Sequence, residues 1–259
     1  ILNTKSTLFL EEPWKSMLEE LASDGLLVLQ VSVPFLREDF RRILEPRAVS
    51  GKERLEAVAK VSDHVPCVIR MQPIIPGIFE ESLDEHVEAV RDSGSRHVIV
   101  EYLRETPHGL EEIYHKLGRK LERGIWEAYS IKGEGLLRPT LSYRRGLLAE
   151  LRGKLAKSGI SLGLCKEGLY EFQDGRDCCG FRFLDQTRVG YRLTLYEVWR
   201  WGNGAFEKAA SDPLILCGEK LAAYPNPVRK ILRAHERKLM KVLSDKNVLQ
   251  KVCPSLASV

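Results

Sequence analysis

Long apolar runs are absent from this sequence. The longest apolar stretch, Leu26 to Val33, is interrupted by Gln30 and Ser32, whereas a membrane-spanning helix needs roughly 18–20 apolar residues. The mean hydropathy is -0.22, and the chain does not open with the charged and apolar regions of a secretory signal peptide. We therefore expect a cytoplasmic protein with no membrane partner.

Cysteine is also scarce, and neither sign of charge dominates. Six cysteines in 259 residues are too few for a disulfide-stapled secreted domain, which favours a reducing compartment. The 40 lysines and arginines exceed the 36 aspartates and glutamates by only four, so a polyanionic partner is permitted but not required. With 44% hydrophobic and 29% charged residues, the chain is typical of a globular protein of one large domain or a domain with an appendage.

The first hundred residues alternate between short apolar runs and helical periodicity. This alternation is typical of repeated βα units around a parallel sheet. Ser50 and Glu53 form a capping-box pattern at the start of one of the helices. Short connections favour a partial (βα) barrel of the TIM type over a doubly wound sheet, with the carboxyl ends of the strands at one rim. The predicted strands cover residues 1–5, 26–33, 65–72 and 96–103.

The second half of the sequence is more helical. Its periodicity predicts one more short strand at residues 160–165 and helices over 110–126, 143–157, 196–201 and 226–243. We expect an α/β fold in two parts. Residues 1–135 form the partial barrel, and residues 136–259 hold the last barrel strand and a mainly helical, cysteine-containing extension.

Polar residues close three of the predicted strands. Lys5 closes the first strand, Ser32 the second, and Arg70 with Gln72 the third, where Pro73 should end the ladder. In a parallel barrel these positions converge and suit a ligand that carries a carboxylate, an amine and hydroxyls. Individually, Lys5 could extend to solvent, Ser32 cap a helix and Arg70 pair with a carboxylate.

A series of short motifs resembles a known family. The order and spacing are similar to the radical S-adenosylmethionine superfamily, in its spore photoproduct lyase-like branch. The resemblance is clear over about residues 1–103 and weaker to about residue 180. The motifs are Asn3-Thr4-Lys5-Ser6, Val31-Ser32-Val33, Glu45-Pro46-Arg47-Ala48-Val49-Ser50, Arg54-Leu55-Glu56-Ala57 and Val68-Ile69-Arg70-Met71-Gln72-Pro73-Ile74-Ile75-Pro76-Gly77.

The resemblance implies a lyase-like radical enzyme. In the family, a [4Fe-4S] cluster reduces S-adenosylmethionine, and the resulting 5'-deoxyadenosyl radical abstracts hydrogen from a substrate. The electron would come from a ferredoxin or a flavodoxin. By position, Lys5 and Ser32 match residues that contact S-adenosylmethionine, and Arg70 would clamp its carboxylate. Ile74, Ile75 and Gly77 would lie against the adenine.

The sequence departs from the family at the cluster. The family's CxxxCxxC loop is absent. The only cysteine among the first 164 residues is Cys67, which lies within a predicted strand. The first two barrel strands are missing as well. Either both precede Ile1 in the natural protein or the chain is degenerate and cannot cleave S-adenosylmethionine. We expect the first, so that the fragment alone is inactive. Its substrate is unknown, with a nucleic-acid lesion as one candidate.

The later cysteines suggest a second site. Cys165, Cys178 and Cys179, with Cys217 as a fourth ligand, would hold an auxiliary iron–sulfur cluster or zinc. Alternatively, they are small buried apolar residues and an exposed thiol. Together with the basic, aromatic helices, these cysteines also support a different function, that of a non-catalytic metal- or nucleic-acid-binding module.

Overall fold

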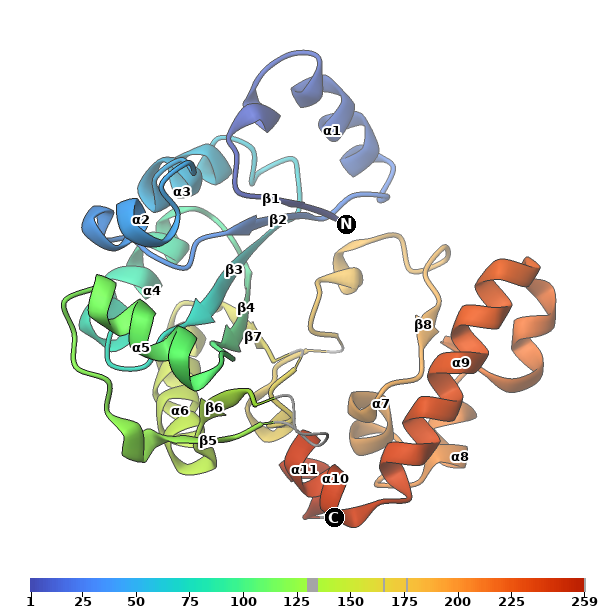
Figure 1. Cartoon of the computed structure of the whole chain (residues 1–259). Helices are drawn as coiled ribbons and strands as arrows, with labels where there is room; N and C mark the ends of the chain where they lie inside the picture. The colour runs from blue at the N-terminus through green and yellow to red at the C-terminus, as the bar shows by residue number, and fades with distance from the viewer. Residues whose placement is uncertain (130–134, 165, 176, 259) are drawn as a thin grey trace. The chain divides into compact units, whose positions relative to one another are not determined.

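A computed structural model describes residues 1–129, 135–164, 166–175 and 177–258 (Figure 1). The chain forms two compact units. The first contains Ile1–Cys165 and Phe172–Asp185, and the second contains Lys166–Glu171 and Gln186–Val259. The predicted division at residue 135 therefore lies inside the first unit.

A five-stranded parallel sheet in the order β1-β2-β3-β4-β7 forms the centre of the first unit (Figure 1). The expected α/β class is thereby confirmed. Its last strand, β7, pairs with β4, which is why the first unit extends past residue 135. The strands are β1 (Leu2–Thr4), β2 (Leu29–Ser32), β3 (Cys67–Ile74), β4 (His97–Tyr102) and β7 (Ser161–Gly163).

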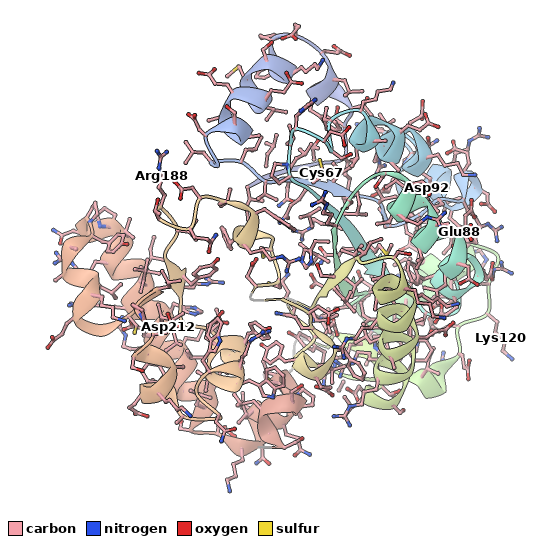
Figure 2. The ribbon with its side chains drawn as sticks, turned by 180° about the vertical axis from the view of Figure 1, so that it is seen from behind. Cys67, Glu88, Asp92, Lys120, Arg188 and Asp212 are labelled. Atoms are coloured by element: carbon pink, nitrogen blue, oxygen red, sulfur yellow. The ribbon has the colours of Figure 1, made fainter. Side chains whose placement is uncertain are left out.

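Helices connect these strands. The Ser50 hydroxyl accepts the N–H of Glu53, whose carboxylate in turn accepts the N–H of Ser50, so the predicted capping box starts α3 as expected. The outer side of α4 carries exposed acidic residues such as Glu88 and Asp92 (Figure 2). The helices are α1 (Trp14–Ser23), α2 (Glu38–Leu44), α3 (Gly51–Ala59), α4 (Leu83–Asp92), α5 (Pro107–Lys116) and α6 (Leu141–Lys157).

The two faces of the sheet differ because side chains alternate along each strand. One face carries buried apolar side chains such as Val31, Ile69 and Val98. At its amino end the other face is also apolar, where Phe183 and Leu184 pack against the cluster of Val28, Val68 and Ile99. Toward the carboxyl end the same face becomes polar. We call this part the polar face, defined by Asn3, Lys5, Gln30, Ser32, Arg70 and Gln72.

Two predicted elements are wrong. Strand β3 continues through Pro73, because a register shift between Met71 and Ile74 leaves the proline out of the regular ladder. The helix expected over residues 110–126 ends at Lys116, and Gly118 follows with a φ of +64°, the left-handed conformation that commonly ends helices. The chain then forms an antiparallel pair of short strands, β5 (Trp126–Ala128) and β6 (Leu137–Pro139).

The second unit is mainly helical. Its two short parallel strands are β8 (Tyr191–Arg192) and β9 (Ile215–Leu216). The helix predicted over residues 226–243 is confirmed as α9. Among the described residues of the chain, no helix combines the length and apolar character needed to cross a membrane. The helices of this unit are α7 (Leu195–Arg200), α8 (Phe206–Ala210), α9 (Asn226–Leu243), α10 (Lys246–Val252) and α11 (Pro254–Ala257).

Candidate functional site

The three cofactor-contact positions predicted at strand ends lie beside one another. Ser32 and Arg70 are register partners, and Thr4 is the partner of Val31, so Lys5 follows β1 at the level of Ser32. Since adjacent strands are about 4.8 Å apart, the sheet brings these three positions into one row. Arg70 lies within β3 rather than at its end, because β3 runs on to Ile74.

Among the described residues, the guanidinium of Arg70 is bound by neutral groups. Its Nη1 donates to Gln30 Oε1 at 2.8 Å and to Asn3 Oδ1 at 3.5 Å, and its Nη2 donates to Gln72 Oε1. No carboxylate pairs with Arg70 among the described residues, so the ion pair considered as an alternative is not found in this part of the chain. Because Arg70 is partly buried, its positive charge favours an anionic ligand.

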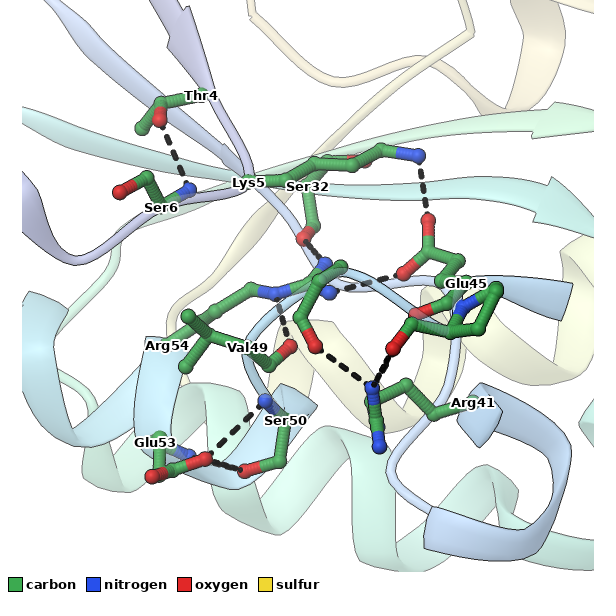
Figure 3. A network of polar contacts seen from close by, with 12 residues as sticks. Thr4, Lys5, Ser6, Ser32, Arg41, Glu45, Val49, Ser50, Glu53 and Arg54 are labelled. Atoms are coloured by element: carbon green, nitrogen blue, oxygen red, sulfur yellow. Dashed lines mark hydrogen bonds and ion pairs between the residues drawn. The ribbon is translucent and has the colours of Figure 1, made fainter. Parts of the chain in front are cut away.

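Lys5 lies next to a buried carboxylate. Its Nζ donates to Glu45 Oε1, while Arg54 Nη2 donates to Glu45 Oε2 at 2.9 Å (Figure 3). Burial by itself would raise the pKa of the Glu45 carboxyl, but the hydrogen bonds from Lys5 and Arg54 bring that pKa below its ordinary value. Glu45 is therefore ionised at neutral pH and shared between two cations.

Arg54 ties the end of β2 to the segment before α3. Its Nη1 donates to the Ser32 carbonyl at 2.6 Å, and its Nε donates to the Val49 carbonyl at 2.7 Å. Arg41 supports the same segment by donating to the Ala48 carbonyl at 2.7 Å (Figure 3). These contacts give residues 45–49 a fixed shape beside the strand ends.

An open groove of about 550 Å³ runs between residues 4–6 and residues 44–49. Its volume is within the range of small-molecule sites. Lys5 and Arg47 bring positive charge to the lining, and Glu45 brings negative charge. The sequence predicts no role for Glu45 and Arg54 beyond their place in the motif series. A sequence does not indicate that two residues nine positions apart will form an ion pair across a turn.

The three residues expected beside adenine lie in different surroundings. Ile74 is fully buried. Ile75 is 2% exposed in a core cluster with Phe35 and Leu110, so its side chain has almost no surface to offer a ligand. Gly77 is exposed, with a φ of +71° and no heavy atom within 4 Å of the point where a Cβ would lie. Its N–H donates to the hydroxyl of Tyr143 at 3.2 Å. The space beside Gly77 is open, as expected, whereas the Ile75 side chain is not available.

His97 anchors the cysteine-bearing loop to the sheet. The Cys178 carbonyl accepts from His97 Nε2 at 3.0 Å, which places the ring proton on Nε2 and leaves Nδ1 to accept from Arg182 at 3.1 Å. Burial and the charge of Arg182 lower the pKa of His97 to about 4. The Cys179 carbonyl accepts from Gln30 Nε2 at 2.6 Å. These buried polar groups were not predicted, since His97 reads as an ordinary strand residue.

The predicted auxiliary metal ligands are described only in part. Cys165 lies outside the described residues, whereas the Sγ atoms of Cys178 and Cys179 are 3.4 Å apart. Within the described ranges, no group of three His, Cys, Asp or Glu side chains is arranged to hold a metal ion. Cys67 lies inside the sheet (Figure 2), where burial raises the pKa of its thiol to about 12. Cys217 is buried in the second unit.

Comparisons with protein-family models, with curated proteins and with solved structures found no match. A function can therefore be proposed only from the geometry of the polar face and from the motif resemblance. Arg70 is a partly buried cation that has no carboxylate partner in the described part of the chain. A groove of ligand size lies at Lys5, and its lining does not include Ser32 or Arg70.

Proposed function

We propose that this chain is the C-terminal portion of a radical S-adenosylmethionine iron–sulfur enzyme and that its polar face binds S-adenosylmethionine. The observation that carries the proposal is Arg70, whose guanidinium has amide oxygens as its partners among the described residues and lies in one row with Ser32 and Lys5. A carboxylate would replace these weak acceptors with charge-assisted hydrogen bonds. The five-stranded sheet would then be part of an incomplete TIM-type barrel.

The residues present fit the cofactor at its polar end. Arg70 would bind the carboxylate, the Ser32 hydroxyl would bind a polar group beside it, and Lys5 would contribute a second cation. Glu45 and Arg54 would act as positioning residues, because they hold Lys5 and the end of β2. When bound and reductively cleaved, S-adenosylmethionine supplies a carbon radical that abstracts hydrogen, and the surrounding protein excludes water from it.

The described residues do not fit a [4Fe-4S] cluster. Three thiolates are required for the family's cluster, whereas Cys67 is buried with a raised thiol pKa and Cys178 and Cys179 lie on one loop. No step is therefore assigned to a cluster bound by these residues. The proposal places the cluster ligands on a CxxxCxxC segment outside this sequence, and Cys165, Cys178 and Cys179 at an auxiliary iron–sulfur or zinc site.

The carboxylate contact can be tested by calorimetric titration of the chain with S-adenosylmethionine. Removing one partner of a charge pair in a binding site costs roughly 2–5 kcal/mol, so Arg70→Gln should weaken binding at least about tenfold. Arg152→Gln is the control, because Arg152 pairs with Asp174 on the surface and should leave binding unchanged. 5'-Methylthioadenosine lacks the carboxylate, so Arg70→Gln and the unmodified chain should bind it with equal affinity.

Two results would contradict this assignment. The first is the absence of saturable binding up to about 1 mM ligand, which corresponds to about -4 kcal/mol. The second is an Arg70→Gln loss that is the same for 5'-methylthioadenosine as for S-adenosylmethionine. The catalytic part of the proposal is tested on a protein that includes the upstream coding segment, after anaerobic reconstitution. It should release 5'-deoxyadenosine when reduced by a ferredoxin or flavodoxin.

A further inference from the structure

Positive charge is distributed unevenly between the two units. The second unit contains 14 lysines and arginines and 8 aspartates and glutamates, a net charge of +6. The first unit contains 26 lysines and arginines and 28 aspartates and glutamates, a net charge of -2. The chain's excess of four positive charges therefore belongs to the second unit, and six of that unit's 14 cations lie on α9, beside a single acidic residue, Glu236.

The helix gathers most of these cations on one side. Arg229, Arg233, Arg237 and Lys241 are spaced four residues apart, which places them in one row with about 6 Å between successive positions. Lys230 lies next to this row. We call these five residues the basic face of α9. In the linear sequence two or three other residues separate Lys230, Arg233, Arg237 and Lys241 from one another, so the concentration of charge becomes evident only when the helix is built.

The basic face is not neutralised within the protein. Its residues form no ion pair with any described residue, and Arg229 donates only to the side-chain oxygen of Asn226. Glu236 is turned to the unit's own backbone, where its Oε1 accepts the N–H of Gly218 at 2.9 Å. Like charges four residues apart repel one another and destabilise a helix. The row therefore costs stability, and an external anion would offset that cost.

The opposite side of α9 is used inside the second unit. Leu239 is buried, and His235 Nε2 donates to the Leu193 carbonyl at 2.8 Å. A helix that lies on a membrane needs its apolar side free to enter the lipid. On α9 the exposed large apolar side chains are Val228, Ile231 and Met240, which are scattered along the helix and do not form a continuous apolar side. The arrangement therefore favours a polyanion in water over a bilayer.

We propose that the basic face of α9 binds the phosphate backbone of a nucleic-acid duplex without reading its bases. The 18-residue helix is about 27 Å long at about 1.5 Å per residue. Phosphates repeat about every 3.4 Å along each strand of a duplex, so the helix spans about eight phosphates. The proposal concerns the second unit alone and does not depend on S-adenosylmethionine binding at the polar face.

Fluorescence anisotropy of a labelled DNA duplex, measured across a salt series, tests this surface. A duplex of about 20 base pairs is longer than α9. Each neutralised phosphate contributes about -0.9 to the slope of log affinity against log salt, so four to five contacts predict a slope of about -4. Replacing Arg229, Arg233, Arg237 and Lys241 together by Gln should weaken binding at least about tenfold and bring the slope close to zero. Glutamine has a good helix propensity, and circular dichroism checks that α9 persists.

The matched control removes four cations elsewhere. Each of these side chains pairs with a surface carboxylate in the first unit, so replacing them by Gln changes net charge equally without touching α9. The control should keep the salt slope of the unmodified chain. The four residues are Lys15, Lys52, Lys116 and Arg123.

Three results would overturn the proposal. In the first, the α9 variant binds the duplex like the unmodified chain. In the second, the α9 variant and the control lose affinity equally, which would indicate an effect of net charge. In the third, the chain binds phosphatidylserine vesicles more tightly than the duplex and the α9 variant loses only that binding, which would assign the surface to membranes. None of these results bears on the titration with S-adenosylmethionine.

Discussion

Arg54 and Glu45 form an ion pair of 2.9 Å that is almost excluded from water, with side-chain exposures of 1% and 9%. The pair joins α3 to the segment that forms one wall of the groove, and Arg54 also holds the last carbonyl of β2. Lys5 reaches the same carboxylate from the solvent side, with a side chain that is half exposed. The groove thus depends on one buried contact and one exposed contact to a single carboxylate.

The buried contact should dominate stability. Arg54→Met removes the buried partner of Glu45 and the donor to the Ser32 and Val49 carbonyls, and leaves the carboxylate with exposed Lys5 alone. Breaking a buried pair costs roughly 3–5 kcal/mol, so we expect this variant to lower the free energy of unfolding by about 3 kcal/mol. Lys5→Met removes an exposed partner and should cost only about 0–1 kcal/mol. Urea unfolding of both variants measures the difference. Equal losses would show that the pair is not the main connection.

Close approach of the cysteine loop to β7 explains why residue 163 is a glycine. A Cβ at Gly163 would lie 2.6 Å from the Cys178 carbonyl oxygen and 2.9 Å from His97 Nε2. We expect Gly163→Ala to destabilise the fold by about 1–3 kcal/mol, as overpacking does. Gly153→Ala on α6 is the control, because nothing lies within 4 Å of its Cβ position and alanine should add up to about 1 kcal/mol there. A neutral Gly163→Ala would contradict the close packing in this loop.

Acid should weaken the first unit through His97. The pKa of this ring is lowered from 6.5 to about 4 in the folded chain. Below pH about 6.5 the ring is therefore protonated in the unfolded chain but still neutral in the folded chain. Stability is therefore lost as pH falls from about 6.5 to about 4, by up to about 3 kcal/mol at about 1.36 kcal/mol per pKa unit.

The contribution of His97 is isolated by comparing unfolding at each pH with His97→Gln. Burial also lowers the pKa of His86, so His97→Gln should keep part of the slope and lose the rest. Parallel pH profiles for the two proteins would show that His97 does not carry the effect.

Local patterns predicted the elements that depend on local physics. The capping box at Ser50, the apolar strands of the sheet and the full length of α9 are all fixed by nearby residues. Trp126 was misjudged because an aromatic residue at helical spacing also suits a short strand, and the Pro73 prediction failed because a register shift admits proline. These outcomes depend on pairing with distant residues.

The candidate site follows the same division. The row of Lys5, Ser32 and Arg70 was predictable, because the strands are parallel and in sequence order. The amide partners of Arg70 and the pairing of Glu45 with Arg54 depend on how distant segments come together at the sheet. The hydrophobic periodicity of the sequence does not predict such contacts. Ile75 was assigned to a ligand by resemblance, yet its side chain is part of the core.

The adjacent thiols of Cys178 and Cys179 are spaced closely enough to bind one zinc ion together. Tetrahedral zinc with Zn–S distances of about 2.3 Å places two thiolates about 3.8 Å apart, close to the 3.4 Å between the Sγ atoms of Cys178 and Cys179. Under the auxiliary-site hypothesis, the reduced protein should bind one zinc per chain in competition with a chromophoric chelator. Replacing Cys178 and Cys179 by Ser should weaken that binding at least about tenfold, since thiolate is the ligand zinc prefers here.

Cys67 supplies the control for the zinc titration. Its thiol is buried with a pKa raised to about 12, so Cys67→Ala should leave zinc affinity unchanged. Cys165→Ser, which removes the third expected ligand, should weaken zinc binding as the paired replacement does. If the protein without Cys178 and Cys179 binds zinc as tightly as the unmodified chain, the auxiliary site is not formed by this loop. The two cysteines would then be explained by packing alone, with His97 and Gln30 holding their backbone to the sheet.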